Sequence, residues 1–368
     1  MTILILNPIL FTAEKNVLPQ IKSIKDSMIY NFASGFVQSG HKVTLIAGED
    51  FRPTEEESYE FEVIFVKTYL KSLFKVSLLP LPLSLWSFLK SQKDHYDLII
   101  SSESFSFTSL FASLIAPSKL VIWHELFVHN KLFFKIPSLV WYNVIVRLCY
   151  RKVCVIPRSR KAALFISKYA RNVSETYVEH GIKTENFIPF EPKEDQFVVV
   201  SRLVPGKRID RIILNFKRFI DTYTICAHYK LLLIGKGEAE STLRALVHDL
   251  HLEEKVLFCG FLSHDKLYPM VSRSKALLID TERDLNMVSI PESVVAGTPV
   301  LANTQPGSSY YIEQNDLGII KDDWDEKELK RIVDNNNYYS LNCQNYRNKL
   351  SNVSVAGEIL NIFNHTHE

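Results

Sequence analysis

Short apolar runs alternate with amphipathic stretches along most of this 368-residue chain. Such an alternation of strand-like and helix-like segments is typical of α/β proteins with doubly wound parallel sheets. The expected strands lie at residues 3–7, 42–47, 62–66, 97–101, 119–123 and 152–156, and again at 196–201, 230–234, 255–258, 275–280 and 299–302. A helix is expected over residues 24–39, with Gly40 after its last turn. The chain is therefore predicted to contain two α/β halves of the same kind.

The boundary between the two predicted domains is inferred from the length of the chain and from one Pro-containing stretch. A chain of this length fits two domains of ordinary size better than one. Residues 186–195, NFIPFEPKED, are the best candidate for a linker. We expect a Rossmann-like domain at 1–190, a second at 191–340, and a C-terminal helix or tail at 341–368 that packs back on the first domain. Because ligands of open α/β sheets bind beyond the carboxyl ends of the strands, the domains are expected to face each other across a cleft.

Composition narrows the class of protein. Hydrophobic residues make up 46% and charged residues 23%, which indicates a globular chain. A net charge of +2 argues against nucleic acid as a partner. Five cysteines without C-x-x-C spacing indicate reduced thiols in a cytoplasmic protein. The first residues lack the basic region of a signal peptide, and no apolar run reaches the ~18 residues of a membrane span.

The most informative segment is DLNMVSIPESVVAGTP, residues 284–299, which places Asp284 and Glu292 eight residues apart. A helix is expected to begin near Pro291 and to carry Glu292 in its first turn. We expect the helix dipole to keep this carboxylate ionised. One carboxylate in a loop and one on a helix can bind hydroxyl groups at the two ends of a nucleotide sugar.

Two further turns follow predicted strands. The sequence RLVPGK places Arg202 and Lys207 five residues apart, and two cations at a strand end suit a diphosphate. The alternative is an exposed basic turn at the start of a helix. Gly235 and Gly237 lie between a strand and a helix, where a tight turn needs glycine whether or not a phosphate binds.

These segments together resemble the retaining glycosyltransferases of family 4 (glycosyltransferase group 1), which have the GT-B fold. That family usually has Glu, seven residues, Glu, a small-residue helix and Gly-Thr-Pro-Val, and Asp284 stands here for the first Glu. The turn at Arg202 and Lys207 resembles the family's G-R-x-x-x-x-K-G element, with Ser201 and Arg208 in place of its glycines. The resemblance covers roughly residues 195–320 well and the N-terminal half only in outline.

The resemblance implies roles for individual residues, which we state as expectations. Arg202 and Lys207 would hold the diphosphate, Asp284 would lie near the donor sugar, and Glu292 would bind the ribose hydroxyls. The remaining donor-site candidates are Gly235, Gly237, Gly260, Phe261, Asn286 and Ser289, with Thr281 and Glu282 sharing the sugar contacts. Phe261 would lie beside the base, and the equal alternative is that it only covers the end of a strand.

In the N-terminal half, the resemblance places His124, at a strand end, near the anomeric carbon of the donor sugar. The alternative for His124 is a structural histidine on a loop. Glu103, Glu125 and His129 are weaker candidates.

The chain departs from the family pattern at two loops. Leu285-Asn286-Met287 replaces the usual Gly-Phe-Gly, which leaves donor identity open. After the first strand the family has a glycine-rich loop, whereas this chain has no glycine before Gly35. Either Lys22, Ser23 and Lys25 bind the acceptor instead, or this loop is an open lid.

No metal or cofactor is expected, because Arg202 and Lys207 can replace a divalent ion on the diphosphate. Asp323-Trp324-Asp325 matches the D-x-D motif of metal-dependent glycosyltransferases, but it precedes EKELKRIVD. We therefore interpret Asp325 as a helix N-cap rather than a metal ligand.

Two segments, residues 70–90 and 131–152, mix aromatic side chains with Lys and Arg. This mixture is typical of surfaces that lie at a membrane interface, although ordinary buried helices are an equal alternative. Two such segments in one half favour contact with the inner face of the cell membrane.

The resemblance implies transfer of a hexose from a nucleotide diphosphate sugar to a hydroxyl acceptor with retention of configuration. The acceptor would be a lipid-linked glycan or a surface polysaccharide, of the capsule or lipopolysaccharide kind. Two alternatives remain: another GT-B enzyme, such as a nucleotide-sugar epimerase or a phosphorylase, and a non-catalytic protein that binds a nucleotide sugar or serves as a scaffold.

Overall fold

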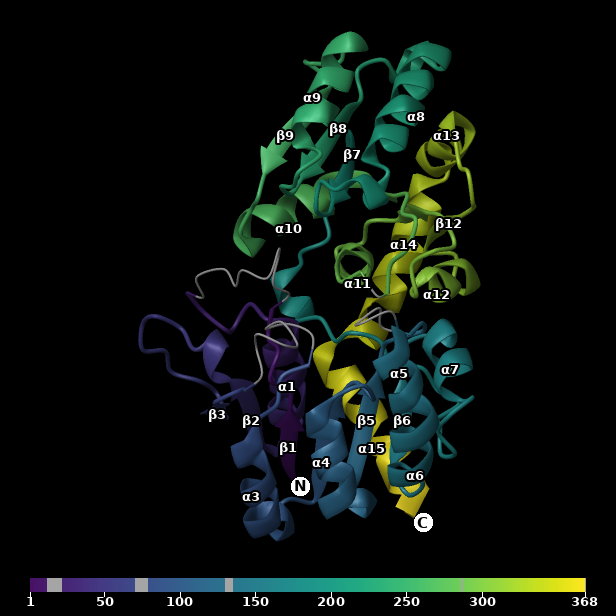
Figure 1. The fold of residues 1–368 in the computed structure, drawn as a ribbon. Coiled ribbons are helices and arrows are strands. Elements are labelled where there is room, and N and C mark those ends of the chain that lie inside the picture. The colour runs from purple at the N-terminus through teal and green to yellow at the C-terminus, as the bar shows by residue number, and fades with distance from the viewer. Residues whose placement is uncertain (12–21, 70–78, 130–134, 286, 368) are drawn as a thin grey trace. The chain divides into compact units, whose positions relative to one another are not determined.

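The computed structural model describes residues 1–11, 22–69, 79–129, 135–285 and 287–367 (Figure 1). It divides into two compact units, Met1–Gly181 with Ser351–Glu368, and Ile182–Leu350. The division falls before the stretch 186–195 that we expected to be the linker, and this stretch lies within the second unit.

The first unit contains a parallel sheet in the order β3-β2-β1-β4-β5-β6. Its strands are β1 (Thr2–Leu6), β2 (Lys42–Gly48), β3 (Glu62–Val66), β4 (Leu98–Ser102), β5 (Leu120–His124) and β6 (Cys154–Pro157). All six strands expected in this half are present, because each is an apolar run long enough to be buried in a parallel sheet.

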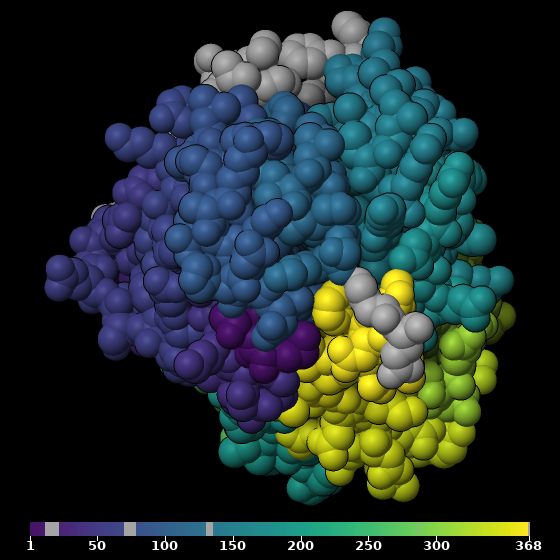
Figure 2. Space-filling model, turned by 90° about the horizontal axis from the view of Figure 1, so that it is seen from below, coloured from purple at the N-terminus to yellow at the C-terminus, as the bar shows by residue number. Residues whose placement is uncertain are grey.

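The helices of the first unit are α1 (Met28–Gln38), α3 (Leu83–Gln92), α4 (Phe107–Ile115), α5 (Ile136–Val140), the π-helical segment η5 (Trp141–Val146), α6 (Arg147–Cys149), α7 (Arg160–Ile166) and α15 (Asn352–His367). Helix α1 begins later than expected because the Ser27 hydroxyl caps it, accepting a hydrogen bond from the Tyr30 N–H at 3.2 Å. Figure 2 shows the face on which the C-terminal segment (yellow) is exposed together with the N-terminal strand (purple).

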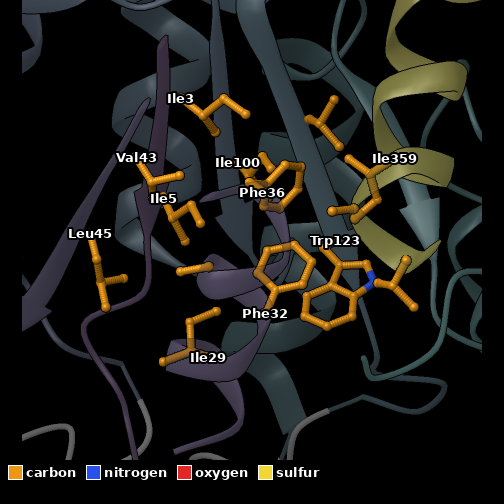
Figure 3. Close-up of a cluster of buried hydrophobic side chains, with 14 of the residues drawn as sticks. Ile3, Ile5, Ile29, Phe32, Phe36, Val43, Leu45, Ile100, Trp123 and Ile359 are labelled. Atoms are coloured by element: carbon orange, nitrogen blue, oxygen red, sulfur yellow. The ribbon is translucent and has the colours of Figure 1, made fainter. Parts of the chain in front are cut away.

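The core on one side of this sheet joins β1, α1 and α15 (Figure 3). The Phe32 ring stacks on Trp123 with 4.4 Å between ring centroids, and Ile359 of α15 is buried in the same cluster. A Cβ at Gly35 would lie 2.2 Å from the Asn352 carbonyl oxygen, so only glycine lets α1 approach the start of α15 this closely. Helix α15 is therefore an integral part of the first unit.

The second unit contains a parallel sheet in the order β12-β11-β10-β7-β8-β9. Its strands are β7 (Glu194–Val200), β8 (Lys230–Ile234), β9 (Val256–Gly260), β10 (Ser274–Ile279), β11 (Val300–Ala302) and β12 (Gly318–Ile320). Its helices are α8 (Ile209–Thr222), α9 (Glu240–Asp249), α10 (His264–Arg273), α11 (Ser289–Val295), α12 (Ser309–Gln314), α13 (Glu326–Asp334) and α14 (Asn336–Tyr346). The five expected strands are present, and the short β12 was not predicted.

In both sheets the first three strands follow one another toward one edge, and the chain then crosses back to place the fourth strand on the other side of the first. The switch points lie between β1 and β4 in the first unit and between β7 and β10 in the second. At such a point the loops that follow the two central strands lead to opposite faces of the sheet, which leaves room for a ligand at the carboxyl edge. These edges are therefore where functional residues are expected.

The D-x-D segment serves as a helix start. The Asp325 carboxylate accepts a hydrogen bond from the Lys327 N–H at 2.9 Å, and Glu328 accepts one from the Asp325 N–H at 3.1 Å. Trp324 is buried and donates its indole N–H to the Ile279 carbonyl at 3.0 Å. The prediction that Asp325 is an N-cap is confirmed.

Replacing Asp325 by Ala should lower the free energy of unfolding by about 1 kcal/mol, because a helix N-terminal N–H loses its acceptor. Asp325→Asn should lose little, since Asn also accepts this bond. Urea unfolding of the two variants checks this, and an equal loss in both would show that the stability comes from the charge of the carboxylate and not from the cap hydrogen bond.

Candidate functional site

The loops that follow β7 and β10 are joined at the switch point of the second unit. The Gly206 carbonyl accepts hydrogen bonds from the Glu282 N–H at 3.0 Å and from the Thr281 hydroxyl at 3.1 Å. The segment with Arg202 and Lys207 is thereby tied to the acidic segment that leads to Asp284. Motifs far apart in the sequence therefore meet at one sheet edge.

Lys207 forms an ion pair with Asp284. Both side chains are largely buried, with 14% and 18% exposed, and Asp284 also accepts a hydrogen bond from the Leu285 N–H at 2.9 Å. The sequence assigned the lysine to the diphosphate and the aspartate to the sugar, and the structure brings the two together. The carboxylate thus holds the ammonium group in one place.

Arg208 occupies the position where the related family has a glycine. Its φ angle is 43°, in the left-handed region, which explains why glycine suits this position. The Arg208 guanidinium lies 3.5 Å from an Asp280 oxygen and 3.8 Å from Glu282. The substitution therefore keeps a strained backbone and adds a cation that links both acidic residues.

Asp280 is a buried acid at the end of β10 that the sequence analysis missed. Its carboxylate lies 3.3 Å from Arg211 and accepts a hydrogen bond from the Asn303 amide at 3.1 Å. Burial raises the pKa of Asp280, and the charges of Arg211 and Arg208 oppose that rise. An acidic residue directly after a buried strand was the signal that could have identified it.

Gly235 and Gly237 allow the turn after β8 to approach the segment after β7. A Cβ at Gly235 would lie 1.9 Å from the Ser201 carbonyl oxygen, and one at Gly237 would lie 2.2 Å from that of Leu203. The Leu203 N–H also donates to the Lys236 carbonyl at 3.0 Å. These glycines therefore have a packing role that is sufficient to require them, and ligand contact by them remains a prediction.

Two of the other donor-site candidates lie at exposed positions. The Phe261 side chain is 79% exposed directly after Gly260, whose φ of 67° turns the chain away from β9. Arg202 is also exposed, whereas Ser289 is half-buried in the first turn of α11. Asn286 lies outside the described residues.

Glu292 differs from the expectation. Helix α11 begins at Ser289, before Pro291, and the Glu292 N–H already bonds to the Val288 carbonyl at 3.1 Å. The half-buried carboxyl has no hydrogen-bond partner within the described part of the chain. Burial raises its pKa to about 8, so the expectation that the dipole of this short helix keeps it ionised is wrong for the ligand-free protein.

In the first unit, His124 is fully buried at the end of β5, and its imidazole contacts the Glu103 carboxylate. Glu103 has a φ of 72° and accepts hydrogen bonds from the Ser104 N–H at 3.0 Å and the Leu126 N–H at 2.9 Å. Burial would raise the pKa of Glu103, but His124 and these hydrogen bonds leave it below its ordinary value. Of these two residues, Glu103 is the one that is partly exposed at the switch point of the first unit.

The remaining candidates in the first unit are held by neighbours. Buried Arg158 donates to Glu125 at 2.9 Å and lies 4.0 Å from the Trp123 ring centroid, a contact that the sequence analysis missed. His129 lies 3.1 Å from the Tyr169 hydroxyl oxygen. A separate set lies before α1, where Ser23 bonds to Glu57 and Lys25 lies 4.0 Å from that carboxylate, while Lys22 is exposed.

Within the described ranges, no group of three or more His, Cys, Asp or Glu side chains is arranged to hold a metal ion. The metal-independent site therefore remains a prediction. In the same ranges no helix is both long and apolar enough to cross a membrane.

Comparison with known proteins relates this geometry to a family. Residues 182–352 match the model of the family "Glycosyl transferases group 1". The chain is 26% identical over 194 residues to GDP-mannose-dependent alpha-(1-6)-phosphatidylinositol monomannoside mannosyltransferase of Mycobacterium tuberculosis, a match that covers 46% of this chain and 48% of that protein. It is 25% identical over 158 residues to O-antigen chain mannosyltransferase RfbU of Salmonella typhimurium, covering 43% of each. The chain thus spans about half the length of the curated relatives it matches.

The structural likeness extends over the whole chain. The crystal structure of Anabaena HepE in complex with UDP superposes with a TM-score of 0.70 at 15% identity, over 99% of this chain and 100% of that one. The fold is therefore the GT-B fold of two Rossmann-like domains, as the sequence predicted.

The raised pKa of Glu292 predicts a pH dependence of stability. Between its ordinary value of 4.5 and about 8, the folded protein keeps a proton that the unfolded chain has released. Its stabilising contribution is therefore complete below pH 4.5 and is lost as the pH rises through 8. Relative to Glu292→Gln, the free energy of unfolding of the wild type should fall by at most about 1.4 kcal/mol per pH unit in this window.

Urea unfolding over a pH series measures this difference. Glu313→Gln, which changes an exposed glutamate of α12, is the matched control and should follow the wild type. Parallel curves for Glu292→Gln and the wild type would show that Glu292 titrates normally.

Proposed function

Because residues 182–352 belong to the group 1 glycosyltransferase family, we propose that the protein transfers a hexose from a nucleotide diphosphate sugar to a hydroxyl acceptor with retention of configuration. The observation that carries the proposal is the meeting of Lys207 and Asp284 at the switch point of the second unit, beside the backbone link through Gly206. Ligands of doubly wound sheets bind at this edge.

The diphosphate is proposed to bind at Arg202 and Lys207. Negative charge grows on the diphosphate as the glycosidic bond to the donor breaks, so cations held in place stabilise the transition state more than the ground state. No enzymic nucleophile is assigned, because retention fits front-face displacement, in which the leaving diphosphate accepts the proton of the acceptor hydroxyl. Asp284 then orients Lys207 and lies on the sugar side of it.

Glu292 is proposed to bind the ribose hydroxyls. A half-buried carboxyl without a partner can accept hydrogen bonds from two adjacent hydroxyl groups. Such bonds favour the ionised form, so nucleotide binding would lower the pKa that burial has raised. Phe261, which is exposed after β9, is proposed to stack on the base.

The acceptor is proposed to be a lipid-linked glycan or a surface polysaccharide. The names of the two mannosyltransferase relatives, which refer to a phosphatidylinositol mannoside and to the O-antigen chain, support this class of acceptor. We further propose that the first unit contacts the cytoplasmic face of the membrane through residues 79–90 and 135–152, the described parts of the two aromatic and basic segments. Leu83 and Leu148 are large apolar side chains exposed in these segments.

A thermal-shift screen against UDP, GDP, ADP, TDP and their common sugars, with and without EDTA, tests the donor site. A nucleotide at 100 times its Kd should stabilise the protein by about 2.7 kcal/mol. We expect a shift with one nucleotide that persists in EDTA and disappears in Glu292→Ala. A shift abolished by EDTA would contradict the metal-free site, and binding without turnover on any acceptor would favour a non-catalytic binding protein.

Substitution of Lys207 tests the chemistry. With the donor from the screen, Lys207→Ala should lower kcat by about a hundred- to thousandfold, because the diphosphate loses a fixed cation. Asp284→Glu should keep most activity and Asp284→Asn should lose it. The control is Lys230→Ala, which removes an exposed lysine of the same unit. Full activity in Lys207→Ala or Asp284→Asn would show that these assignments are wrong.

A further inference from the structure

A basic groove lies in the first unit on the helical segment η5–α6 and the chain after α7. Figure 1 labels α6 and α7, the helices beside it. It encloses about 520 Å³ and is lined by four cations, Arg147, Arg151, Lys168 and Arg171, together with the apolar side chains of Val144 and Leu148. Among the residues that the structure describes, no acidic one lines it. We call this site the basic groove.

Two of the four cations, Arg147 and Arg151, are positioned by neutral groups. Arg147 donates to the Lys168 carbonyl at 3.2 Å and lies 5.8 Å from the Tyr169 ring centroid, and Arg151 lies 3.4 Å from the Arg147 carbonyl. Within the described residues none of the four pairs with a carboxylate. Four like charges around one space repel one another, so an anion bound there would relieve that repulsion.

In the helical segment that lines one side of the groove, every fourth residue is buried. Ser138, Tyr142, Val146 and Tyr150 are buried, and the residues two positions after the first three, Val140, Val144 and Leu148, are 53%, 45% and 58% exposed. In a regular α-helix a spacing of four drifts by ~40° at each step. The π-helical segment η5 has more residues per turn, so it opposes this drift and keeps the three apolar side chains on one side.

The apolar row and the basic groove are continuous. Val144 and Leu148 belong to both, and Val140 extends the row away from the cations. A soluble phosphate compound could use the cations, but it would leave this row in water. An anionic membrane surface accepts both features, because phosphate groups lie just above the acyl chains.

We propose that the basic groove binds the phosphate group of an anionic membrane lipid while Val140, Val144 and Leu148 enter the adjoining acyl layer. The site gives the proposed membrane contact a specific location and rests on that part of the proposed function. Lipid binding is measured without donor or acceptor, so failure of the transferase assignment would leave it testable.

The test is co-sedimentation of the full chain with two kinds of vesicle, one of phosphatidylcholine alone and one of phosphatidylcholine with an equal amount of phosphatidylglycerol. We expect binding to the second kind only. The triple variant Arg147→Gln, Lys168→Gln, Arg171→Gln should bind about 100-fold more weakly, since each cation near an anionic surface contributes roughly a factor of five. Wild-type protein that does not bind, or that binds both kinds equally, would overturn the proposal.

A matched control separates the groove from overall charge. Lys230→Gln, Lys266→Gln, Lys327→Gln removes three exposed cations from the second unit and should bind like the wild type. An equal loss in this control would show nonspecific attraction and overturn the groove as a site. If the triple variant does not unfold cooperatively, the single variant Arg171→Gln, expected to lose about fivefold, replaces it.

Two further experiments distinguish a membrane lipid from a soluble phosphate compound as the ligand. Val144→Ser with Leu148→Ser should weaken vesicle binding although all four cations remain, and unchanged binding would show that the row does not enter the lipid. Inorganic phosphate is added to the wild type and the triple variant in thermal unfolding. Stabilisation of the wild type alone, without vesicle binding, would assign the groove to a soluble phosphate compound and overturn the lipid.

Discussion

The candidate site of the second unit depends on the parallel pairing of β7 with β10. Ala276 lies opposite Phe197, and Leu277 opposite Val198, although the two strands are separated by the whole of β8, β9 and their helices. The pairing brings two strand ends together at the point where the chain changes direction across the sheet. Every charged residue of the site lies in the chain that follows one of these two strand ends. The pairing of the strands therefore determines where the two loops meet.

The electrostatics of this edge follow from its burial. Burying one charge is costly unless another of opposite sign accompanies it, and here Lys207 has Asp284 while Asp280 has Arg208 and Arg211. Glu292 is the exception, because it responds to burial by keeping its proton instead of finding a partner. The two ion-paired groups at this edge therefore carry a net positive charge, because Asp280 is shared by two arginines.

The first unit uses its sheet edge differently. His124 is enclosed in the core and contacts Glu103, so the edge presents a carboxylate held by two backbone N–H groups rather than an imidazole. The unit is completed by α15, which returns from the far end of the chain to pack on α1 at Gly35. Its basic groove lies elsewhere, on the segment η5–α6 and the chain after α7. The family model begins at residue 182 and so does not include this part of the chain.

The sequence by itself determined those features that depend on neighbouring residues. The eleven expected strands are apolar runs, and Asp325 caps its helix through bonds within three residues. The three-residue β12 was not predicted, although β11, which is equally short, was. The donor-side motifs were also visible, since their order and spacing are local.

Tertiary structure alone decided the rest. The ion pair of Lys207 and Asp284 joins residues 77 positions apart, and no local pattern specifies that contact. The ionisation of Glu292 and the enclosure of His124 depend on how much water the surrounding elements exclude, and the helix dipole considered in sequence terms gave the wrong sign for Glu292. Burial is a property of the packed units, and the free energy of a charge depends on burial more strongly than on its sequence neighbours.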